Sequence, residues 1–539
     1  MSTLGHFLIQ KLREYGVREV FGIPGDFALP LFRCLEEEGS LRLVTFSHEP
    51  AVGFAADGAA RCSGRLGVAC VTYGAGALNM VNPVAGAYAE KSPVVVISGG
   101  PGRDEKARGV ALHHQVKSFA TQLRVYREVT QGAFVLDDPA TAAQSIEEAL
   151  AAARHYSRPV YLEVPRDLVD APLPAPSSPP AALPREDPGA VEEAADEVGE
   201  RVRKSRRPVL MVGVELQRFG LGSAATELAE AYGLPTVSSF MARGTFPSHH
   251  PLFAGVYLSE AGRRAVAQLV EGSDCLLLLG VILSDVNMGV RLRRLHPDRV
   301  IHAFDRQVRA RHHRFDQVSL EGLLRALLSR VRGSRPRRRA LPPKRSFRLA
   351  RRLGGSPISV LDLIGVLNRF LRERERMVLV SDTGDPLFAS VDLDTDHLVA
   401  SACYATMGFA VPAALGIQVA VGWRPLVLVG DGAFQMTGPE LSQCARYGLN
   451  PIVVVFRNDS WEMLQVFIPG RFNEIPAWPF ARLAGHWGGA GFRAETPRAL
   501  WESLLKAHAE RRFSLIEVPL KRGDTSPVLR RFTTALRKG

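Results

Sequence analysis

Oxygen-bearing side chains follow two apolar runs in the last third of the chain. Asp431 lies between glycines directly after the run PLVLV, and Asn458 follows the run PIVVVF. A carboxylate and an amide oxygen suit Mg²⁺, which prefers few protein ligands together with water and phosphate oxygens. Gly432 allows close approach of the backbone, and N–H groups at the start of the next helix, from Ala433 onward, favour a phosphate. The spacing therefore predicts a magnesium and phosphate site.

A carboxylate and two adjacent imidazoles stand in the first third of the chain. Asp26 lies in the string FGIPGDF, and His113 and His114 lie in GVALHHQ. Histidine is the side chain best suited to moving protons near neutral pH. Two further His-His pairs, at 249–250 and 312–313, show that the dipeptide alone indicates nothing, and we assign them no function.

Apolar segments alternate with helical stretches along the whole chain, and they predict the elements that position these groups. Examples are PVVVISGG, PVYLEVP, DCLLLLGVIL, RVIHAFD, PLVLVGDG and PIVVVFRN. Strands that are apolar throughout are buried on both faces, which indicates parallel sheets covered by helices. Ligand sites in such sheets lie beyond the carboxyl ends of the strands. The predicted fold class is therefore α/β, with three doubly wound parallel-sheet domains.

Two segments divide the chain into these three domains. Asp170–Gly189 is rich in proline, and residues 331–355 contain ten Lys or Arg and no acid. Both segments resemble connectors, because proline prevents regular structure and single-sign charge runs are usually solvated. The predicted domains are residues 1–170, 190–332 and 356–530, and the predicted linkers are residues 171–189 and 333–355.

Composition bounds the partners. The net charge is +12 and the pI is about 9.6, but the basic linker supplies most of the excess, so we expect no specific nucleic-acid partner. The six cysteines form no CxxC pair and no zinc pattern. No apolar run reaches the roughly 20 residues of a membrane helix, and the N-terminus predicts an amphipathic helix rather than a signal peptide. We expect a cytoplasmic protein with no membrane partner.

The spacing of Asp431 and Asn458 resembles the thiamine diphosphate motif, in which GDG is followed after some two dozen residues by NN. Arg457 replaces the first Asn of that pair. The resemblance implies Mg²⁺ held by Asp431, Asn458 and the backbone carbonyl of Ser460. It extends to TFSHEPAVGFAADGAAR, where Glu49 matches the carboxylate that activates the aminopyrimidine ring of the cofactor. A glutamate at a helix start is otherwise explained by the helix dipole.

Two more segments carry the resemblance across the chain. Thr383, Gly384 and Asp385 match a segment that touches the aminopyrimidine, and ATMGFAVPAALG matches the segment that supports the bent cofactor. There Ala405 begins the string, and Met407 occupies the position of the bulky wedge. In this family two subunits build each active site, so the resemblance implies at least a homodimer and, as is usual, a homotetramer.

Asp26 and the His113-His114 pair resemble the pyruvate decarboxylase branch of the family. The implied reaction is the non-oxidative decarboxylation of a small-molecule 2-keto acid to an aldehyde and CO₂, through the cofactor ylide and an enamine. The cofactor performs the bond cleavage. Asp26, His113 and His114 are expected to move protons and to position the substrate carboxylate.

One departure indicates the substrate. The pyruvate decarboxylase pattern has a Glu six residues after the metal-ligand Asn, and this chain has Leu464 there. The change resembles the phenylpyruvate decarboxylase subgroup, and an apolar side chain favours a larger apolar substrate. We expect phenylpyruvate or indole-3-pyruvate as the substrate. Asp285, in the middle domain, either supplies the missing acid at the site edge or caps a helix.

Two alternatives remain open at this stage. A thiamine diphosphate-dependent carboligase, of the acyloin or acetohydroxyacid synthase or lyase type, would trap the same intermediate with a second carbonyl compound. A catalytically silent protein with this fold would use the basic linker to bind an acidic partner. The His113-His114 pair and Asp26 argue against the first, and the intact set of site residues argues against the second.

Overall fold

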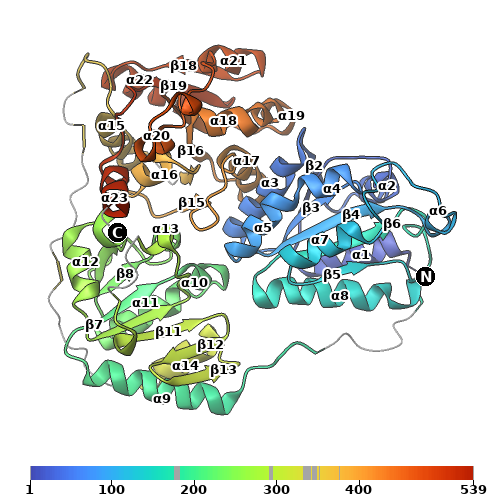
Figure 1. Ribbon diagram of the computed structural model, residues 1–539, viewed down its shortest axis with the longest axis horizontal. Helices are drawn as coiled ribbons and strands as arrows, with labels where there is room; N and C mark the ends of the chain where they lie inside the picture. The colour runs from blue at the N-terminus through green and yellow to red at the C-terminus, as the bar shows by residue number, and fades with distance from the viewer. Residues whose placement is uncertain are drawn as a thin grey trace.

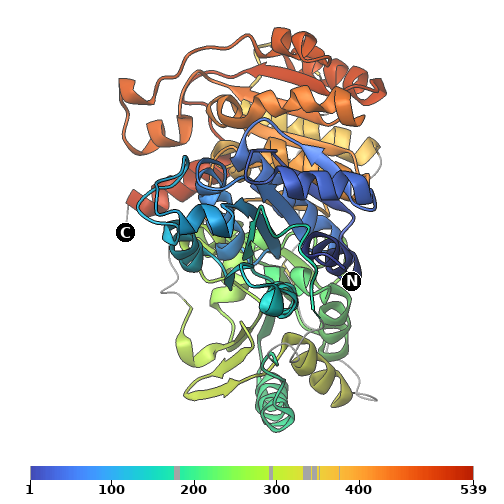
Figure 2. The same cartoon turned by 90° about the vertical axis from the view of Figure 1, so that its right-hand side faces the viewer.

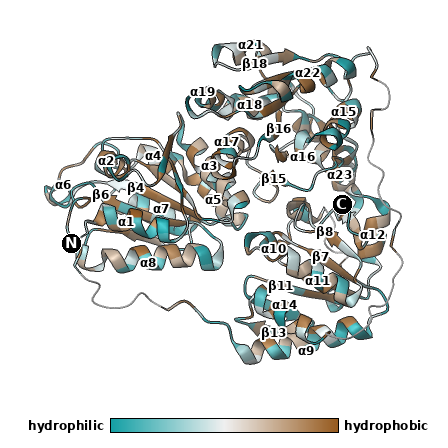
Figure 3. Ribbon diagram, turned by 180° about the vertical axis from the view of Figure 1, so that it is seen from behind, coloured by the Kyte–Doolittle hydropathy of each residue, from teal (hydrophilic) through white to brown (hydrophobic). Residues whose placement is uncertain are grey.

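The computed structural model has three α/β domains, which follow one another along the chain (Figure 1). It describes residues 2–174, 182–289, 295–331, 341–342, 349–350, 353–374 and 377–537. Seen from the right-hand side of Figure 1, the first domain faces the viewer, with the third domain above it and the middle domain below it (Figure 2). Each domain contains one sheet whose apolar strands are covered by helices with a polar outer face (Figure 3).

The first domain contains a six-stranded sheet in which all neighbouring strands are parallel, in the order β2-β1-β3-β4-β6-β5. Its strands are β1 (Glu19–Gly22), β2 (Arg42–Thr45), β3 (Gly67–Val71), β4 (Val94–Gly100), β5 (Ala133–Val135) and β6 (Val160–Pro165). Its helices are α1 (Leu4–Glu14), α2 (Leu29–Glu38), α3 (Glu49–Ser63), α4 (Ala75–Asn79), α5 (Val81–Ala89), α6 (Arg103–Ala107), α7 (Thr121–Val129) and α8 (Pro139–Tyr156). The predicted amphipathic helix is α1, which buries Leu4, Leu8 and Leu12 completely.

The middle domain contains a seven-stranded sheet in the order β13-β12-β11-β10-β7-β8-β9. Its strands are β7 (Pro208–Val212), β8 (Thr236–Ser238), β9 (Phe253–Val256), β10 (Cys275–Leu279), β11 (Val300–Phe304), β12 (Gln307–Ala310) and β13 (His313–Asp316). Its helices are α9 (Pro188–Lys204), α10 (Val214–Arg218), α11 (Gly222–Tyr232), α12 (Arg264–Glu271), α13 (Asp285–Met288) and α14 (Leu320–Ser329), with 3₁₀ turns η1 (Phe240–Ala242), η2 (Ser259–Ala261) and η4 (Pro297–Arg299).

The middle sheet is mixed, which differs from the wholly parallel sheet predicted. Strands β11, β12 and β13 pair antiparallel at one edge. Only two residues, Asp305 and Arg306, connect β11 with β12, and both have positive φ (54° and 60°). A turn of two residues with positive φ joins antiparallel strands, whereas parallel strands need a much longer crossover.

The third domain contains a second all-parallel six-stranded sheet, in the order β15-β14-β16-β17-β19-β18. Its strands are β14 (Val378–Ser381), β15 (Leu398–Ala400), β16 (Pro425–Gly430), β17 (Ile452–Arg457), β18 (Ala490–Arg493) and β19 (Ser514–Pro519). Its helices are α15 (Val360–Glu373), α16 (Asp385–Ser390), α17 (Ala410–Val421), α18 (Asp431–Thr437), α19 (Cys444–Tyr447), α20 (Glu462–Phe467), α21 (Phe480–His486), α22 (Pro497–Ala509) and α23 (Pro527–Arg537), with 3₁₀ turns η5 (Gly438–Gln443) and η6 (Arg471–Asn473).

Equivalent helices of the first and third domains pack directly against each other. Helix α3 and helix α17 belong to one shared hydrophobic core. A Cβ atom on Gly58 would lie 2.5 Å from the Ala413 carbonyl oxygen, and one on Gly416 would lie 2.0 Å from that of Ala55. Glycine is therefore required at both positions for the two backbones to approach so closely.

The predicted linkers are described only in part. Helix α9 begins at Pro188, two residues before the predicted domain start at residue 190, and Asp187 caps its first N–H groups. Residues 175–181 of the first linker, and most of the second linker, lie outside the described residues. Among the described helices, none is long and apolar enough to cross a membrane.

Candidate functional site

The first half of the candidate site lies at the carboxyl edge of the third sheet. Strands β16 and β17 are parallel neighbours, with Gly430 opposite Phe456. Asp431 is the first residue of α18, and Asn458 follows the last residue of β17. The two predicted metal ligands therefore come together at one sheet edge, as the sequence predicts.

Backbone N–H groups fix the Asp431 carboxylate. One oxygen accepts the N–H of Gly432 at 2.9 Å, and the other accepts those of Asn458 at 2.9 Å and Asp459 at 2.6 Å. Despite these donors, burial raises the pKa of Asp431 to about 6. A bound cation would stabilise the charged carboxylate at this position.

Asn458 and Ser460 leave oxygen atoms available beside this carboxylate. Within the described residues, the Asn458 side-chain oxygen and the Ser460 hydroxyl are buried without a hydrogen-bond partner. The Ser460 backbone carbonyl accepts one hydrogen bond, from Glu462 N–H at 2.8 Å, and a carbonyl has two lone pairs. Buried acceptors without partners are costly, and a hard divalent ion would satisfy them. The donor set therefore fits Mg²⁺.

Arg457, the departure from the NN pair, is held away from the metal ligands by two carboxylates. Its guanidinium bonds Asp459 at 3.0 Å and Glu517 on β19 at 2.5 Å. Asp459 has a φ of +55°, and its N–H is one of the donors to Asp431. The Arg457 ion pairs thus stabilise the turn that carries Asn458.

Gly432 packs closely against Trp461. A Cβ atom there would lie 2.2 Å from the ring of Trp461. Ala433 follows it in the first turn of α18 and is buried.

The segment from Thr383 to Asp385 follows strand β14, and a buried aspartate holds it. Asp382 accepts backbone N–H groups of Thr383, Gly408 and Ala410 at 2.8–3.0 Å, while burial raises its pKa to about 6. Its bonds to Gly408 and Ala410 join the segment to the loop that carries Ala405 and Met407. Asp382 opens the string DTGD, which resembles a segment that touches the aminopyrimidine.

The remaining residues of segment 383–385 and of the loop with Ala405 and Met407 differ in backbone conformation and in exposure. Gly384 has a φ of +104°, and Ala405 has a φ of +59°. Met407 is exposed, as a wedge against a ligand requires. Asp385 is buried instead, and its carboxylate accepts the N–H of Ser526 at 2.9 Å, so that it faces the start of α23.

The second half of the candidate site belongs to the first domain. Glu49 begins α3, is half-buried, and accepts a hydrogen bond from Asn79 at 2.9 Å. The preceding Ser47 donates to the buried carboxylate of Glu440 in η5 at 3.0 Å. This contact ties the start of α3 to the third domain.

Asp26, His113 and His114 form one cluster. His113 Nε2 lies 2.7 Å from Asp26 Oδ2, and the two imidazole rings are 4.8 Å apart. Phe27 stacks on His113 at 4.8 Å. His114 has a φ of +65°, and Arg166 lies 3.8 Å from Asp26. The structure thus brings Asp26 together with the His113-His114 pair, although 87 positions separate Asp26 from His113 in the sequence.

Leu464 and Asp285 lie in different domains. Leu464 on α20 is 48% exposed, and Ile468 and Phe472 beside it are more exposed still. Asp285 is exposed at the first position of α13, where it accepts the N–H of Val286 at 2.8 Å. The cap of this helix is the hydroxyl of Ser284.

Asp285 also acts on the loop of Ala405 and Met407. The pKa of Cys403 is raised chiefly by burial, and also by the negative charges of Glu90 and Asp285. The middle domain therefore places Asp285 near this loop.

The Asp26 cluster lies away from the metal ligands in one copy of the chain. In Figure 1, α2 and α6, near Asp26 and the histidines, lie at the right-hand edge, whereas α18 and α20 lie in the upper left. Within the described residues, no hydrogen bond or ion pair joins Asp26, Glu49 or His113 to Asp431 or Asn458.

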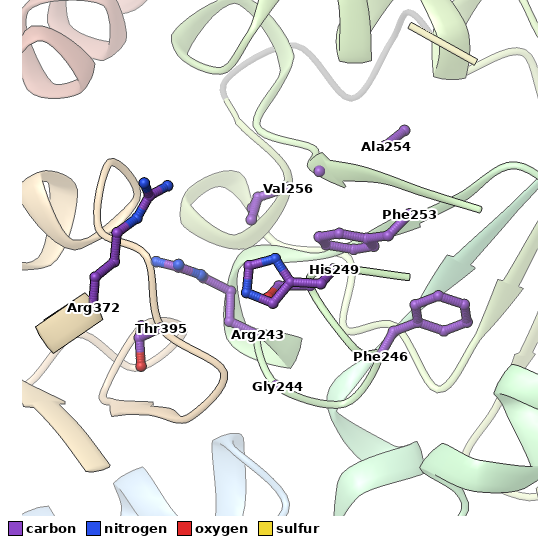
Figure 4. Close-up of a pocket in the computed structure, with 11 residues that line it drawn as sticks. Arg243, Gly244, Phe246, His249, Phe253, Ala254, Val256, Arg372 and Thr395 are labelled. Carbon is purple, nitrogen blue, oxygen red and sulfur yellow. The ribbon is translucent and has the colours of Figure 1, made fainter. Parts of the chain in front are cut away.

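A separate cavity of about 130 Å³ lies between the middle and third domains (Figure 4). Arg243, His249, Phe253 and Arg372 are among its lining residues. None of the predicted site residues lines it.

Comparisons with known proteins agree with this geometry. The family models "Thiamine pyrophosphate enzyme, N-terminal TPP binding domain", "central domain" and "C-terminal TPP binding domain" match residues 2–122, 195–331 and 387–518. The indole-3-pyruvate decarboxylase of Azospirillum brasilense is 47% identical over 533 residues, which cover 98% of this chain and 97% of that protein. The probable pyruvate decarboxylase Pdc101 of Schizosaccharomyces pombe is 30% identical, with 93% and 90% covered. Pyruvate decarboxylase isozyme 3 of Saccharomyces cerevisiae is 28% identical, with 90% and 89% covered. The chain therefore belongs to the thiamine diphosphate-dependent 2-keto acid decarboxylase family.

Proposed function

We propose that this protein catalyses the non-oxidative decarboxylation of indole-3-pyruvate or phenylpyruvate to the aldehyde and CO₂. The observation that carries the proposal is the hydrogen bond between His113 and Asp26, next to His114. The relative that is 47% identical bears the name of an indole-3-pyruvate decarboxylase, which favours indole-3-pyruvate.

Thiamine diphosphate and Mg²⁺ fit the residues of the third domain. Asp431, Asn458 and the Ser460 carbonyl would hold the ion, and the backbone at Gly432 and Ala433 would lie along the diphosphate.

The exposed Met407 would support the bent cofactor, with Thr383, Gly384 and Ala405 beside it. Asp385 would act through the position of this segment, because its carboxylate is already bonded to Ser526. Thiamine diphosphate supplies a thiazolium ring that accepts the electron pair of the bond to the departing CO₂.

Glu49 would hydrogen-bond a ring nitrogen of the cofactor. Its carboxylate has one partner, Asn79, and is half-buried, so it can take a second donor without losing the first. A carboxylate accepts several hydrogen bonds, and a charge-assisted bond is stronger than a neutral one.

The Asp26 cluster would hold and move protons. The Asp26 carboxylate orients the His113 ring through their hydrogen bond, and Phe27 stacks on that ring. His114 lies beside His113, so a proton at His113 Nε2 has a nearby acceptor. Arg166 adds positive charge, which would attract the substrate carboxylate.

The substrate side chain would meet an apolar surface. Leu464, Ile468 and Phe472 expose apolar groups near the metal ligands, on α20 and η6. Burying an indole or phenyl ring against them would be favourable, at about 25 cal/mol per Å² of apolar surface. Asp285 would stand at the edge of this pocket, near the Met407 loop.

The separation of the halves supports a shared active site. A second copy of the chain would bring its Glu49 and Asp26 to the first copy's Asp431 and Asn458, so we propose a homodimer at least and a homotetramer as the full assembly. The six cysteines are unpaired, which agrees with a reducing, cytoplasmic location.

The experiment measures aldehyde and acyloin formed from indole-3-pyruvate, phenylpyruvate and pyruvate, with thiamine diphosphate and Mg²⁺ added. We expect aldehyde from the aryl substrates in preference to pyruvate, and loss of turnover in Glu49→Gln. Acyloin as the main product would favour the carboligase alternative, and full activity of Glu49→Gln would contradict the assigned role of Glu49.

A further inference from the structure

We propose that Asp26, His113 and His114 form a binding site for a transition-metal ion of the zinc type, and that its occupation inhibits the enzyme. The site is distinct from the magnesium site in the third domain. The inhibition rests on the proposed function, whereas the binding itself does not.

Three potential ligand atoms converge in this cluster. One nitrogen from each imidazole and one carboxylate oxygen all lie within 4.8 Å of one another. The shortest separation is 2.7 Å, between His113 Nε2 and Asp26 Oδ2. A tetrahedral zinc ion with bonds of about 2.0–2.2 Å places its ligands about 3.3 Å apart. Small rotations, which open the shortest separation and close the others, would bring all three atoms to this distance.

The three side chains are accessible to an ion from solution. The side chain of His113 is 58% exposed and that of Asp26 is 40% exposed, and His114 is exposed as well. Their exposure leaves space for these rotations. Three protein ligands also leave one coordination position open for water or for an oxygen of a 2-keto acid.

The donor types separate this site from the magnesium site. Two imidazoles and one carboxylate suit zinc, cobalt, nickel and copper ions, whereas Mg²⁺ prefers oxygen ligands alone. Asp431, Asn458 and Ser460 offer only oxygen. One protein would thus hold two ions of different chemistry.

Neighbouring groups favour the ligand arrangement. Phe27 stacks on His113 and fixes the plane of its ring. Arg166 lies 3.8 Å from Asp26, and its guanidinium also forms an ion pair with Glu105. The negative charge of Glu105 reduces the repulsion between Arg166 and a bound metal ion. Contacts that hold the ligand side chains in place strengthen metal sites.

The two other His-His pairs provide matched controls. His250 contacts one carboxylate, Glu230, at 3.0 Å, and His313 contacts one, Glu197, at 2.6 Å. Neither belongs to a group of three ligand atoms within the described residues, where the Asp26 cluster is the one group found. Only the fold distinguishes the three His-His pairs, because the dipeptides themselves are identical in sequence.

Occupation would remove the groups that handle protons. A metal ion would take a lone pair from each imidazole and would break the hydrogen bond between His113 and Asp26. Proton transfer through these residues would stop while Mg²⁺ and the cofactor remain in place.

Binding is tested on the full-length protein without cofactor, with Co²⁺ as the probe, because tetrahedral Co²⁺ with nitrogen ligands absorbs visible light. The variants are His114→Asn and the control His312→Ala. Asn tolerates the φ of +65° at position 114, so the loop keeps its backbone conformation. We expect one Co²⁺ per chain in the wild type and in His312→Ala, displaced by Zn²⁺ but not by Mg²⁺. We expect binding at least about tenfold weaker in His114→Asn. Equal binding by His114→Asn and the wild type would overturn the site.

Inhibition is tested separately with aldehyde formation as the readout, in excess thiamine diphosphate and Mg²⁺. Zn²⁺ at the concentration that displaces Co²⁺ should abolish wild-type turnover. Full turnover with Zn²⁺ bound would overturn the inhibition. Absence of turnover without Zn²⁺ would contradict the proposed function, and the Co²⁺ measurement would still decide the metal site.

Discussion

The side-chain oxygen of Asn458 is buried without a partner in the described structure, next to a carboxylate that burial makes harder to ionise. Such a combination lowers the stability of the protein alone and favours a bound cation. An unpaired buried oxygen beside a buried carboxylate therefore indicates a ligand site. Ordinary packing would pair the amide or replace it with an apolar residue.

The unpaired side-chain oxygen of Asn458 leads to a prediction for Asn458→Ala. The unfolding midpoint of the ligand-free protein should stay unchanged or rise, because an unpaired acceptor is removed. The stabilisation by Mg²⁺ and thiamine diphosphate should fall from about 2.7 kcal/mol, measured at a hundred times the wild-type Kd, to near zero. Thermal unfolding with and without the ligands measures both effects, and dialysis against a chelator should reproduce the ligand-free midpoint in the wild type.

Asn368 provides the control for this prediction. Its amide bonds the carbonyl of Asp392 at 3.0 Å and the N–H of Asp394 at 2.7 Å. Asn368→Ala should lower the ligand-free midpoint and leave the ligand-induced stabilisation intact. An undiminished ligand effect in Asn458→Ala would contradict the metal assignment.

Leu464 carries the prediction for specificity. Leu464→Glu places a charge in an apolar surface, so the ratio of kcat/KM for phenylpyruvate to that for pyruvate should fall by about tenfold or more. Leu361 on α15, 37% exposed, provides the control because it lies outside the candidate site. If the ratio changes equally in Leu361→Glu, or is unchanged in Leu464→Glu, then Leu464 does not determine specificity.

At the scale of elements, the two glycines between α3 and α17 determine how closely the first and third domains approach. Gly416→Ala would place a Cβ atom 2.0 Å from the Ala55 carbonyl oxygen, in a helix that cannot move without displacing the sheets. We expect a loss of about 1–3 kcal/mol in the free energy of unfolding, measured by chemical denaturation.

Gly485→Ala is the matched control, because a Cβ atom there meets nothing within 4 Å and the residue lies in helix α21. This change should be neutral or slightly stabilising, since alanine reduces the entropy of the unfolded chain. Equal effects of the two substitutions would show that the contact between α3 and α17 does not limit stability.

The sequence predicts buried elements better than edge elements. Central strands such as β4, β10 and β16 are apolar throughout, and each was predicted within one to four residues of its observed bounds. Edge strands such as β15 and β5 have only three residues, too few for a pattern. The β11–β12 hairpin was missed because its turn is Asp-Arg, which lacks the glycine that usually marks a positive φ.

The candidate site likewise contains residues that the sequence predicts and residues that it does not. Spacing at strand ends predicted Asp431 and Asn458, because parallel topology brings successive strand ends to one edge. Glu440 lies outside the predicted set, since a buried carboxylate that bonds backbone N–H groups has no sequence pattern. Gly432 is predicted to allow a ligand to approach the backbone, and the fold adds a second requirement, because a Cβ atom there would lie 2.2 Å from the ring of Trp461.

At the scale of the whole molecule, the first and third domains have the same topology. The strand orders β2-β1-β3-β4-β6-β5 and β15-β14-β16-β17-β19-β18 are identical when each is counted from its own first strand. The sequence shows no residue-level repeat between them. Helices α3 and α17 occupy equivalent places in the two domains and pack together. One domain carries the acid and the histidines, and the other carries the metal ligands.

This division of labour predicts complementation between two inactive variants. In a shared site, Glu49→Gln disables the first-domain half and Asp431→Asn the third-domain half. A mixed dimer then contains one site with both changes and one intact site. Random association at equal amounts should restore about a quarter of the wild-type activity, since half of the dimers are mixed.

The control pairs Glu49→Gln with Asp26→Asn, which lie in the same half and leave each site with one defect. Co-expression with two different affinity tags isolates the mixed dimers, whose aldehyde formation should reach about half that of the wild type because one of their two sites is intact. Activity in the first mixture and none in the second would place each active site between two chains, whereas inactivity of both would require a complete site within one chain.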